Sequence, residues 1–314
     1  MTDGLTVAPR SGGHSYVGAS AADGTMVIDL RRVGGDVAYD GDTTVATVPA
    51  AAALDSVQGA LAGHDRLIPS GSCPTVGIAG LTLGGGLGAD TRSAGLTCDA
   101  LESASIVLPG GELVTASPDD HAELFWALCG GGGGNFGVTT SFSFRTYPAA
   151  DRDVVTMRYP DPAVADVIVG WSQWLATSDR AVWGLINIPV GHAARGCTVV
   201  LATPAGAGAS RAAELVAAIG ASPLSTETRT RGRLDFVRYF EGGDGASRPR
   251  PFVAGSDIIG ELTSGAAQAI VAAAKSWPAK AGGGTAVIES LTGAIRDVAP
   301  DATAFPWRRA ATSI

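Results

Sequence analysis

Short apolar runs separated by glycine-rich stretches characterise the first half of the chain. The short runs at 25–30 and 43–48 predict strands, and alternation of apolar and polar residues predicts another strand at 136–147. Two further runs within 100–117 flank a Pro-Gly-Gly turn, and this arrangement predicts a hairpin. The first half is therefore expected to be rich in strands that are joined by glycine loops.

Apolar residues recur with helical spacing in four other segments. The predicted helices are 51–63, 117–129, 162–176 and 265–277. Ser117 is a good N-cap for the second helix. Trp171 and Trp174 lie three residues apart on the third helix, so we expect them to share one face and to pack in a core.

The glycine content and the order of the predicted elements change near residue 149. After this point the glycine loops thin out, and the strand-like runs 181–190 and 197–203 alternate with the helical segments. A chain of 314 residues is more typical of two domains than of one. We therefore place a domain boundary near residue 149.

Composition and charge narrow the possible functions. The chain has 44 glycines, about twice the ordinary share of ~7%, which suggests a backbone that approaches something closely. Its net charge is −8 and it has no basic run, so nucleic acid is not an expected partner. The chain has two lysines, Lys275 and Lys280, and neither follows a G-x-x-x-x-G sequence, so a phosphate-binding Walker loop is excluded.

No segment reads as a transmembrane helix or as a secretory signal. We expect a cytoplasmic protein without a membrane partner. The oligomeric state is not readable from the sequence. The four cysteines, Cys73, Cys98, Cys129 and Cys197, form no C-x-x-C pair, so neither a disulfide framework nor a metal site is expected.

The opening stretch "APRSGGHSYVG" (8–18) is the first candidate for chemistry. Successive backbone N–H groups in a glycine-rich turn form a concavity that binds anions, so this loop is able to hold a pyrophosphate. The alternative is a plain surface turn with a solvated His14. The stretch alone does not decide between them.

Two stretches match dinucleotide fingerprints, namely 84–89 and 132–137. Such a motif needs a strand before it and a helix after it, because the helix N-terminus receives the phosphate. At 132–137 the order is reversed, and the segment after 84–89 is a poor helix. A nicotinamide dehydrogenase is therefore disfavoured.

Cys73 lies among turn residues in "PSGSCPTVGIAG", which indicates an accessible loop and not the burial that is usual for cysteine. We interpret Cys98 and Cys197 as structural and leave Cys129 open. The histidines other than His14 share no metal or triad spacing, and we interpret them as non-catalytic: His64, His121 and His192.

Four blocks in order resemble one family: "RSGGHSYVG", "PSGSCPTVGIAGLTLGGGLG", "TRSAGLTCDALESASIVLPGGELV" and "LFWALCGGGGGNFGVTTSFSF". The chain resembles the berberine-bridge-enzyme-like FAD-linked oxidases of the vanillyl-alcohol-oxidase (PCMH) type. The resemblance is strongest over 8–148. It implies an α+β fold, with a PCMH-type FAD-binding domain at 1–148, a substrate domain at 149–295 with an antiparallel sheet covered by helices, and a return segment at 296–314.

The resemblance also implies the cofactor and its contacts. FAD would be bound covalently through His14, to the flavin 8α-methyl, and through Cys73, to flavin C6. The remaining implied FAD contacts are Arg10, Ser11, Gly12, Gly13, Ser15, Gly71, Val76, Gly77, Gly80, Gly85, Gly86, Gly137 and Val138. Glycines at such positions let the backbone approach a flat cofactor.

The implied reaction is oxidation of an alcohol or C–H centre of a small molecule such as a sugar, a glycoside or an alkaloid-like metabolite. A hydride would pass to flavin N5, and O₂ would reoxidise the flavin to give H₂O₂. A second hypothesis is a catalytically inactive flavin-binding or partner-binding module.

Two departures from the family pattern motivate that second hypothesis. Family members carry several tens of residues before the histidine loop, and a closing segment that supplies a Tyr or Glu base; neither is matched here. We therefore expect a chain truncated at both ends, with an incomplete FAD domain. A misplaced start and stop, a degenerate gene product and complementation by a partner all stay open. No catalytic base is assigned, and Tyr159 and Tyr239 are interpreted as structural.

Overall fold

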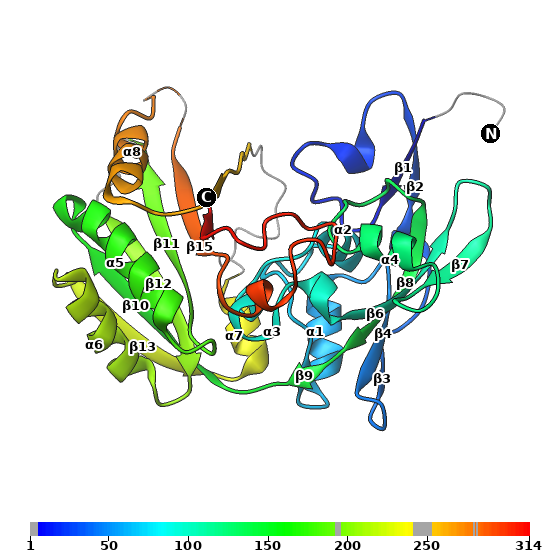
Figure 1. Cartoon of the computed structure of the whole chain (residues 1–314), viewed down its shortest axis with the longest axis horizontal. Helices are drawn as coiled ribbons and strands as arrows, with labels where there is room; N and C mark the ends of the chain where they lie inside the picture. The colour runs from blue at the N-terminus through cyan, green and yellow to red at the C-terminus, as the bar shows by residue number, and fades with distance from the viewer. Residues whose placement is uncertain (1–5, 192–195, 241–252, 279, 281) are drawn as a thin grey trace. The chain divides into compact units, whose positions relative to one another are not determined.

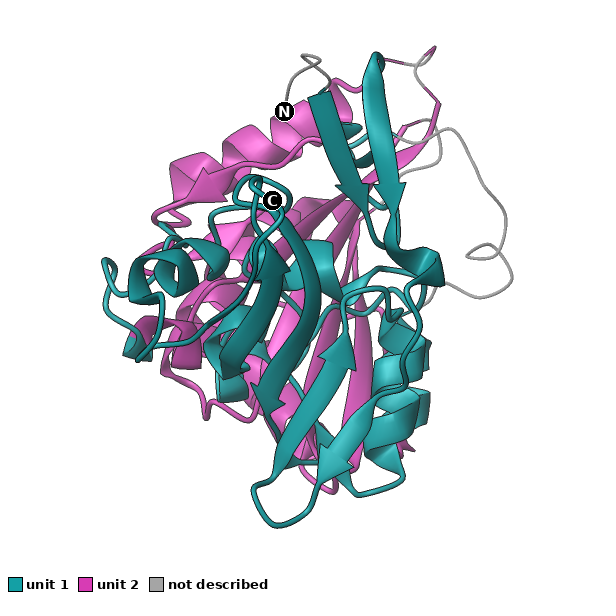
Figure 2. Ribbon diagram, turned by 90° about the vertical axis from the view of Figure 1, so that its right-hand side faces the viewer, with its two compact units in different colours: residues 1–149, 233–254, 297–306 teal, residues 150–232, 255–296, 307–314 magenta. Residues whose placement is uncertain are grey.

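The computed structural model describes residues 6–191, 196–240, 253–278, 280 and 282–314. The chain divides into two compact units, coloured separately in Figure 2. Unit 1 comprises 1–149, 233–254 and 297–306, and unit 2 comprises 150–232, 255–296 and 307–314. Each unit therefore combines segments that are distant in the sequence.

Unit 1 is built on a five-stranded antiparallel sheet with two smaller strand pairs. The sheet has the order β3-β4-β8-β6-β7, β1 pairs with β2 in parallel, and β5 pairs with β9. The strands are β1 (Thr6–Arg10), β2 (Thr25–Asp29), β3 (Ala38–Asp40), β4 (Val45–Pro49), β5 (Arg66–Leu67), β6 (Leu101–Val107), β7 (Leu113–Ala116), β8 (Val138–Arg145) and β9 (Tyr147–Pro148).

The helices of unit 1 are short. They are α1 (Leu54–Ala62), α2 (Ile78–Leu83), α3 (Thr91–Ala94), α4 (Ala122–Leu128) and α7 (Arg233–Tyr239). Short 3₁₀ turns span Ala19–Ala21, Leu30–Arg32 and Thr97–Ala100. Leu54, Val57 and Leu61 of α1 are fully buried, as expected for apolar residues spaced three and four apart on one helix face.

Unit 2 is a seven-stranded sheet whose paired strands all run antiparallel. The strand order is β13-β10-β12-β11-β15-β16-β14. The strands are β10 (Arg152–Tyr159), β11 (Trp183–Val190), β12 (Cys197–Pro204), β13 (Ser225–Arg231), β14 (Ile258–Ile259), β15 (Gly284–Ser290) and β16 (Thr312–Ser313). The helices are α5 (Val164–Thr177), α6 (Gly208–Ile219) and α8 (Ser264–Lys275), with 3₁₀ turns at Asp161–Ala163 and Gly293–Asp297.

One face of this sheet carries the core of unit 2. Alternate residues of its strands, such as Met157, Ile186 and Ile288, pack against α5, α6 and α8, which lie together beside the sheet in Figure 1. Trp171 of α5 is fully buried in this core, and Trp174 packs against it. The core role predicted for both tryptophans is therefore confirmed.

The predicted fold class, α+β with a helix-covered antiparallel sheet in the second half, agrees with this architecture. The helix predicted at 117–129 begins later than expected, at Ala122. The Ser117 hydroxyl accepts hydrogen bonds from the N–H groups of Asp119 and Asp120, and His121 follows with a φ of 52°. Ser117 thus closes a turn ahead of the helix and does not cap it, because its acceptor is satisfied locally.

The helix α7 (Arg233–Tyr239) belongs to unit 1, although the sequence analysis places it inside the predicted domain 149–295. Residues 297–306 belong to unit 1 as well. The assignment of FAD binding to 1–148 and of substrate binding to 149–295 stays a prediction.

Candidate functional site

Two loops of unit 1 cross in direct backbone contact. The first, residues 11–16, follows β1, and the second, residues 68–77, precedes α2. A Cβ added at Gly12 would lie 2.2 Å from the Gly77 nitrogen, and one added at Gly77 would lie 2.1 Å from Ser11 Oγ. Glycine is required at both positions, because any side chain would drive the loops apart.

Hydrogen bonds fix this crossing on both sides. The Ser11 hydroxyl donates to the Ala50 carbonyl oxygen over 2.7 Å. The N–H of Leu54 donates to the Val76 carbonyl, and the N–H of Ile78 donates to the Ala52 carbonyl. The start of α1 therefore holds the second loop in place, so that the first loop rests on a fixed support.

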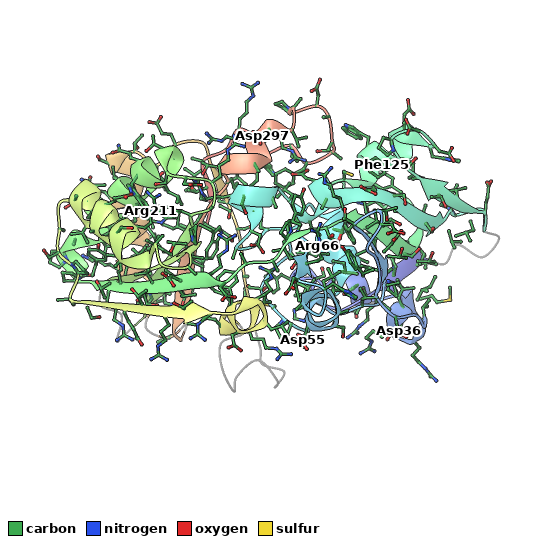
Figure 3. The ribbon with its side chains drawn as sticks, turned by 90° about the horizontal axis from the view of Figure 1, so that it is seen from below. Asp36, Asp55, Arg66, Phe125, Arg211 and Asp297 are labelled. Atoms are coloured by element: carbon green, nitrogen blue, oxygen red, sulfur yellow. The ribbon has the colours of Figure 1, made fainter. Side chains whose placement is uncertain are left out.

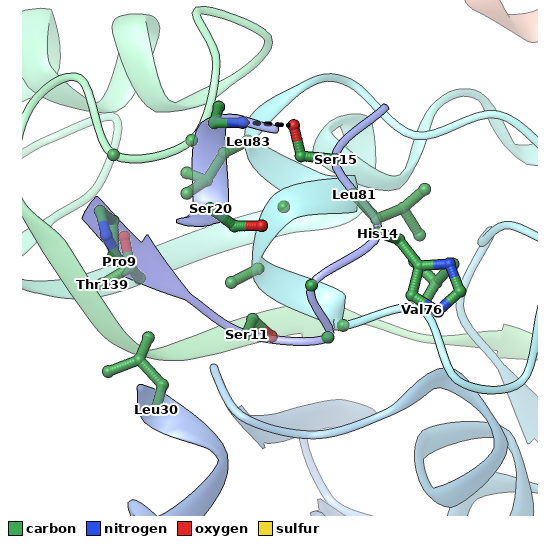
Figure 4. Close-up of a pocket in the computed structure, with 18 of the residues that line it drawn as sticks. Pro9, Ser11, His14, Ser15, Ser20, Leu30, Val76, Leu81, Leu83 and Thr139 are labelled. Atoms are coloured by element: carbon green, nitrogen blue, oxygen red, sulfur yellow. Dashed lines mark hydrogen bonds between the residues drawn. The ribbon is translucent and has the colours of Figure 1, made fainter. Parts of the chain in front are cut away.

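A cavity of about 430 Å³ opens beside this crossing, and Figure 4 shows it with Ser11, His14, Val76 and Thr139 on its wall. Its size is within the range of small-molecule and cofactor sites. The residues that line it are Pro9, Ser11, Gly12, Gly13, His14, Ser15, Tyr16, Ala19, Ser20, Leu30, Val76, Gly77, Ala79, Gly80, Leu81, Leu83, Gly133, Gly134, Gly137 and Thr139.

The cavity brings together much of the predicted FAD contact set. The predicted residues that line it are Ser11, Gly12, Gly13, His14, Ser15, Val76, Gly77, Gly80 and Gly137. They come from the two crossing loops, from α2 and from the start of β8. Segments more than a hundred residues apart in the chain thus meet around one space.

The other predicted contacts lie outside the lining of this cavity. They are Arg10, Gly71, Cys73, Gly85, Gly86 and Val138. Packing explains two of these glycines: a Cβ at Gly85 would lie 2.7 Å from the Phe305 ring, and one at Gly86 would lie 2.2 Å from the Thr97 hydroxyl. The sequence motif alone does not separate a glycine that faces a ligand from one that faces a neighbouring side chain.

His14 and Cys73, the two predicted attachment points, lie on the two crossing loops. The His14 Nε2 is 2.9 Å from the Thr75 hydroxyl oxygen, and Thr75 is only two residues after Cys73. Cys73 is exposed, whereas Cys98, Cys129 and Cys197 are buried. The interpretation of Cys73 as an accessible loop residue and of Cys98 and Cys197 as structural is consistent with this placement, and Cys129 is also a core residue.

Thr139 contributes a polar atom that the sequence analysis missed. Its side chain is 3% exposed, and its hydroxyl has no hydrogen-bond partner among the residues that the structure describes. A buried hydroxyl without a partner is costly, so a ligand in the cavity is a natural partner for it. The alternation along β8 predicts which residues share a face, but it does not predict that this face borders a cavity.

Gly133 and Gly134 also line the cavity, although they are not among the predicted FAD contacts. A Cβ at Gly134 would lie 2.8 Å from the Pro9 ring. The signal was present in the run of five glycines that follows α4, which the sequence analysis considered only as a dinucleotide fingerprint.

Unit 2 carries a carboxyl group with an unusual pKa. Burial raises the pKa of Glu289 on β15 from its ordinary 4.5 to about 7, and a hydrogen bond from the Trp183 indole opposes this. The Trp183 Nε1 donates to Glu289 Oε1 over 3.3 Å. Raised carboxyl pKa values are enriched at functional sites, because such groups change charge near neutral pH.

The remaining titratable residues considered in the sequence are structural or lie on the surface. Tyr159 is buried in the core of unit 2, and burial raises its pKa to about 12, as befits a structural tyrosine. His121 precedes α4 at the surface and contacts the Asp120 carboxylate. The His64 ring contacts the Tyr39 ring in a tilted arrangement, and His192 lies outside the described residues. Among the described residues, no cluster of metal-ligating side chains occurs.

Comparison with known proteins shows the family to which the chain belongs. The FAD binding domain family model matches residues 2–117. An uncharacterized FAD-linked oxidoreductase of Bacillus subtilis, YgaK, is 32% identical over 308 residues, which cover 96% of this chain and 67% of that protein. The chain belongs to the FAD-linked oxidoreductase family. The predicted resemblance is thus confirmed, and FAD is the cofactor of the family.

Other relatives of this FAD-linked oxidoreductase match over shorter stretches. The FAD-linked oxidoreductase pynB of Aspergillus niger is 39% identical over 193 residues, which cover 59% of this chain and a third (33%) of that protein. Xylooligosaccharide oxidase of Thermothelomyces thermophilus is 39% identical over 180 residues, covering 55% of this chain and 36% of that protein. The chain thus spans only part of the length of these relatives.

Solved structures share the fold. Xylooligosaccharide oxidase from Myceliophthora thermophila, determined in complex with xylobiose, is 25% identical with a TM-score of 0.85 over 99% of this chain and 69% of that one. Glucooligosaccharide oxidase from Acremonium strictum, described with a 6-S-cysteinyl, 8α-N1-histidyl FAD, has a TM-score of 0.87 at 24% identity, covering 99% of this chain and 68% of that one. The PCMH-type fold predicted from the sequence is confirmed.

The residues of this FAD-linked oxidoreductase fit the cofactor. A Cβ added at Gly80 meets no atom within 4 Å, so the backbone of α2 faces open space on the cavity side. The unsatisfied Thr139 hydroxyl offers a hydrogen bond, and the loop of residues 11–16 offers backbone N–H groups of the kind that bind pyrophosphate. No helix within the described part of the chain is both long enough and apolar enough to cross a bilayer.

Proposed function

We propose that this chain binds FAD covalently through His14 and Cys73 and oxidises an alcohol group of a small carbohydrate with O₂ as the acceptor. The alcohol would lose a hydride from its carbon and a proton from its oxygen, and O₂ would take up these two electrons and two protons to give H₂O₂. One observation carries the proposal: the His14 loop and the Cys73 loop cross at a glycine-lined cavity, and the hydrogen bond between His14 and Thr75 joins them.

The chain's own residues would hold and orient the cofactor. Ser11, Gly12, Gly13 and Ser15 would contribute backbone contacts, and Thr139 would satisfy its hydroxyl. His14 and Cys73 are both exposed and are therefore accessible to the ring system. When bound, FAD supplies the two-electron chemistry that no side chain supplies. The apolar wall formed by Leu81, Leu83 and Val76 would exclude water from the cavity.

The substrate class rests on the relatives and on the sheet of unit 2. Two relatives with 39% identity are named for xylooligosaccharides and glucooligosaccharides. The face of the unit 2 sheet opposite its helices carries Trp183, Asn187 and Glu289. Amide and carboxyl oxygens accept hydrogen bonds from hydroxyl groups, so this face suits a hydroxyl-rich ligand. Glu289 would then bond a sugar hydroxyl.

An absorption spectrum of the purified protein, before and after acid precipitation, tests flavin attachment. Yellow colour that stays with the precipitate indicates a covalent flavin. We expect colour to persist in His14→Ala and in Cys73→Ala, where one link is left, and to be lost from the precipitate of the double variant. His121→Ala is the matched control, since His121 is an exposed histidine away from the cavity. Colour retained in the precipitated double variant would refute the assignment of these two residues.

Peroxide release tests the reaction. A panel of xylo-, gluco- and chitooligosaccharides, together with simple alcohols, would be incubated with the flavin-loaded protein under air. Peroxide with oligosaccharides but not with simple alcohols supports the proposal. A bound flavin without peroxide from any substrate would support a flavin-binding module in its place.

A further inference from the structure

The loop that carries Cys73 is held at both ends, although Cys73 itself is exposed. We call residues 68–77 the Cys73 loop. Ile68, Pro69 and Ser70 are buried at its start, and Gly77 is buried at its end. Within the loop, the N–H of Val76 donates to the Cys73 carbonyl over 3.2 Å. The position of the thiol is therefore determined by what anchors the two ends.

A buried polar network anchors the start of the loop. The Arg233 guanidinium donates to Asp90 Oδ2 over 2.7 Å and to Gln58 Oε1 over 3.0 Å. The other end of the same amide, Gln58 Nε2, donates to Ser70 Oγ over 2.5 Å. We call these four residues the Arg233 network: Arg233, Asp90, Gln58 and Ser70.

Every member of the Arg233 network is removed from water. The exposed fractions are 9% for Arg233, 3% for Asp90, 1% for Gln58 and 6% for Ser70. Water does not compete for hydrogen bonds between buried polar groups. When one of these bonds is broken, the remaining donor or acceptor stays unsatisfied. Packing leaves Ser70 little room as well, since a Cβ at Gly88 would lie 1.8 Å from the Ser70 carbonyl oxygen. The network thus fixes the backbone three residues before Cys73.

A second contact from the same helix reaches the other side of Cys73. Arg238 of α7 donates to Asp55 Oδ1 over 3.0 Å, and the backbone N–H of Asp55 donates to the Pro74 carbonyl over 3.0 Å. Asp55 is labelled in Figure 3, beside α7. The Arg238 and Asp55 side chains are 49% and 45% exposed, and an exposed pair of this kind contributes little. It serves as an internal comparison for the buried pair.

We propose that the Arg233 network positions Cys73. α7 begins directly after Gly232, the residue at which the chain leaves unit 2, and it delivers a guanidinium group into unit 1. Through Gln58 and Ser70 this group fixes the orientation of the Cys73 loop and hence of the thiol. The relevance of that orientation to flavin attachment rests on the proposed function, but the positioning itself does not require flavin.

A purely structural role for Arg233 makes a different prediction. Suppose that the Arg233–Asp90 ion pair only stabilises unit 1. Loss of the hydrogen bond from Gln58 to Ser70, with this ion pair left intact, would then not change the Cys73 loop selectively. Gln58→Met removes this hydrogen bond, because methionine has a similar length and no hydrogen-bonding amide. It also avoids the uncompensated buried charge that Arg233→Met would create.

The experiment compares wild type, Gln58→Met, Ser70→Ala and Arg238→Met, all as the full chain. Two quantities are measured: amide hydrogen exchange of peptides that cover 68–77, and the rate at which N-ethylmaleimide modifies the Cys73 thiol in folded protein prepared without flavin. Because the other cysteines are buried, the maleimide rate reports on Cys73, and peptide mass analysis identifies the modified residue.

We expect Gln58→Met and Ser70→Ala to speed exchange in 68–77 by about two- to tenfold, as loss of one buried hydrogen bond implies, and to change the maleimide rate by a similar factor. Arg238→Met should leave both quantities within about twofold of wild type. Unchanged exchange in 68–77, equal acceleration throughout unit 1, or an equal effect of Arg238→Met would each overturn the proposal.

The absorption spectrum of the same wild-type sample separates this result from the proposed function. A colourless wild type would count against FAD attachment, whereas the exchange and maleimide measurements would still decide whether the Arg233 network holds the Cys73 loop in place. In a flavin-loaded sample, the fraction of flavin linked to the Cys73 peptide should fall in Gln58→Met, relative to the fraction linked to the His14 peptide. Equal fractions in wild type and Gln58→Met would contradict a role in placing the thiol.

Discussion

Replacement of Glu289 by Gln should change the pH dependence of stability in a predictable direction. Burial raises the pKa of this carboxyl from 4.5 to about 7 in the folded protein. Between these two values the folded state binds more protons than the unfolded state. The free energy of unfolding should therefore fall as the pH rises from about 4.5 through about 7. Glutamine carries no charge at any of these values, so the variant should lack this dependence.

The magnitude follows from the gap between the two pKa values. At about 1.4 kcal/mol for each tenfold change in a proton equilibrium, a rise from 4.5 to about 7 corresponds to about 3 kcal/mol. Relative to wild type, Glu289→Gln should gain about 3 kcal/mol between about pH 4.5 and about pH 8. A second variant tests the opposing contribution: Trp183→Phe removes the indole N–H that favours the carboxylate. It should raise the pKa of Glu289 further.

Urea unfolding followed by tryptophan fluorescence is a suitable assay. Of the six tryptophans only Trp126 lies in unit 1, so the signal reports mainly on the unit that contains Glu289. Glu261→Gln is the matched control, because Glu261 is an exposed glutamate in the same unit. If the difference in unfolding free energy between Glu289→Gln and wild type stays constant within about 0.5 kcal/mol across this pH range, the reasoning is refuted.

Three further predictions concern the cavity and the packing of unit 2. Gly80→Leu should lower the bound FAD content, because the added side chain would enter the cavity. Gly59→Leu on α1 should not, because Gly59 also faces open space but does not line the cavity. Flavin absorbance per protein chain measures the FAD content, and equal values for the two variants would contradict FAD binding in this cavity. Asp153 accepts hydrogen bonds from Thr230, Gly206 and Gly208; burial raises its pKa, but these bonds outweigh burial and lower the pKa. Asp153→Asn should therefore lower the free energy of unfolding by about 2 kcal/mol at neutral pH. This difference from wild type should shrink as the pH falls below 3.8, the ordinary pKa of the group. A difference in urea unfolding that does not change with pH would contradict a stabilising role of the ionised carboxylate. Gly170→Ala should lower the melting temperature, although alanine has the better helix propensity, because the added Cβ would lie 2.8 Å from Ile219 Cα where α5 meets α6. For Gly59→Ala, where the space is open, we expect the melting temperature to rise. An equal rise in Gly170→Ala would show that α5 and α6 move apart to accommodate the methyl group.

The elements that follow from local pattern were predictable. β2, β4, β11 and β12 lie in short strand-like runs, β8 lies where apolar and polar residues alternate, and α5 and α8 lie where the apolar spacing is helical. These patterns record which face of an element is buried, and that information is local. β13 shows the limit. Its sequence Ser225–Arg231 is polar, and only its antiparallel pairing with β10 makes it a strand.

The same distinction applies to the candidate site. The resemblance carried by four sequence blocks was sufficient to place His14 and Cys73 on two loops and to predict FAD. It did not separate Gly80, which faces open space, from Gly85, which faces the Phe305 ring. The Thr139 hydroxyl was missed for the same reason, since its β8 pattern is that of any half-buried strand.

The fold class and the cofactor followed from the resemblance of four sequence blocks to one family, and the glycine-rich, accessible character of both loops followed from residue type and spacing along the chain. Long-range packing places α7 in unit 1, pairs Arg233 with Asp90 across 143 residues of sequence, and brings the two loops together at Gly12 and Gly77. Each of these contacts joins segments that are distant in the chain. Their formation depends on packing and burial in the folded protein, and no local pattern records it.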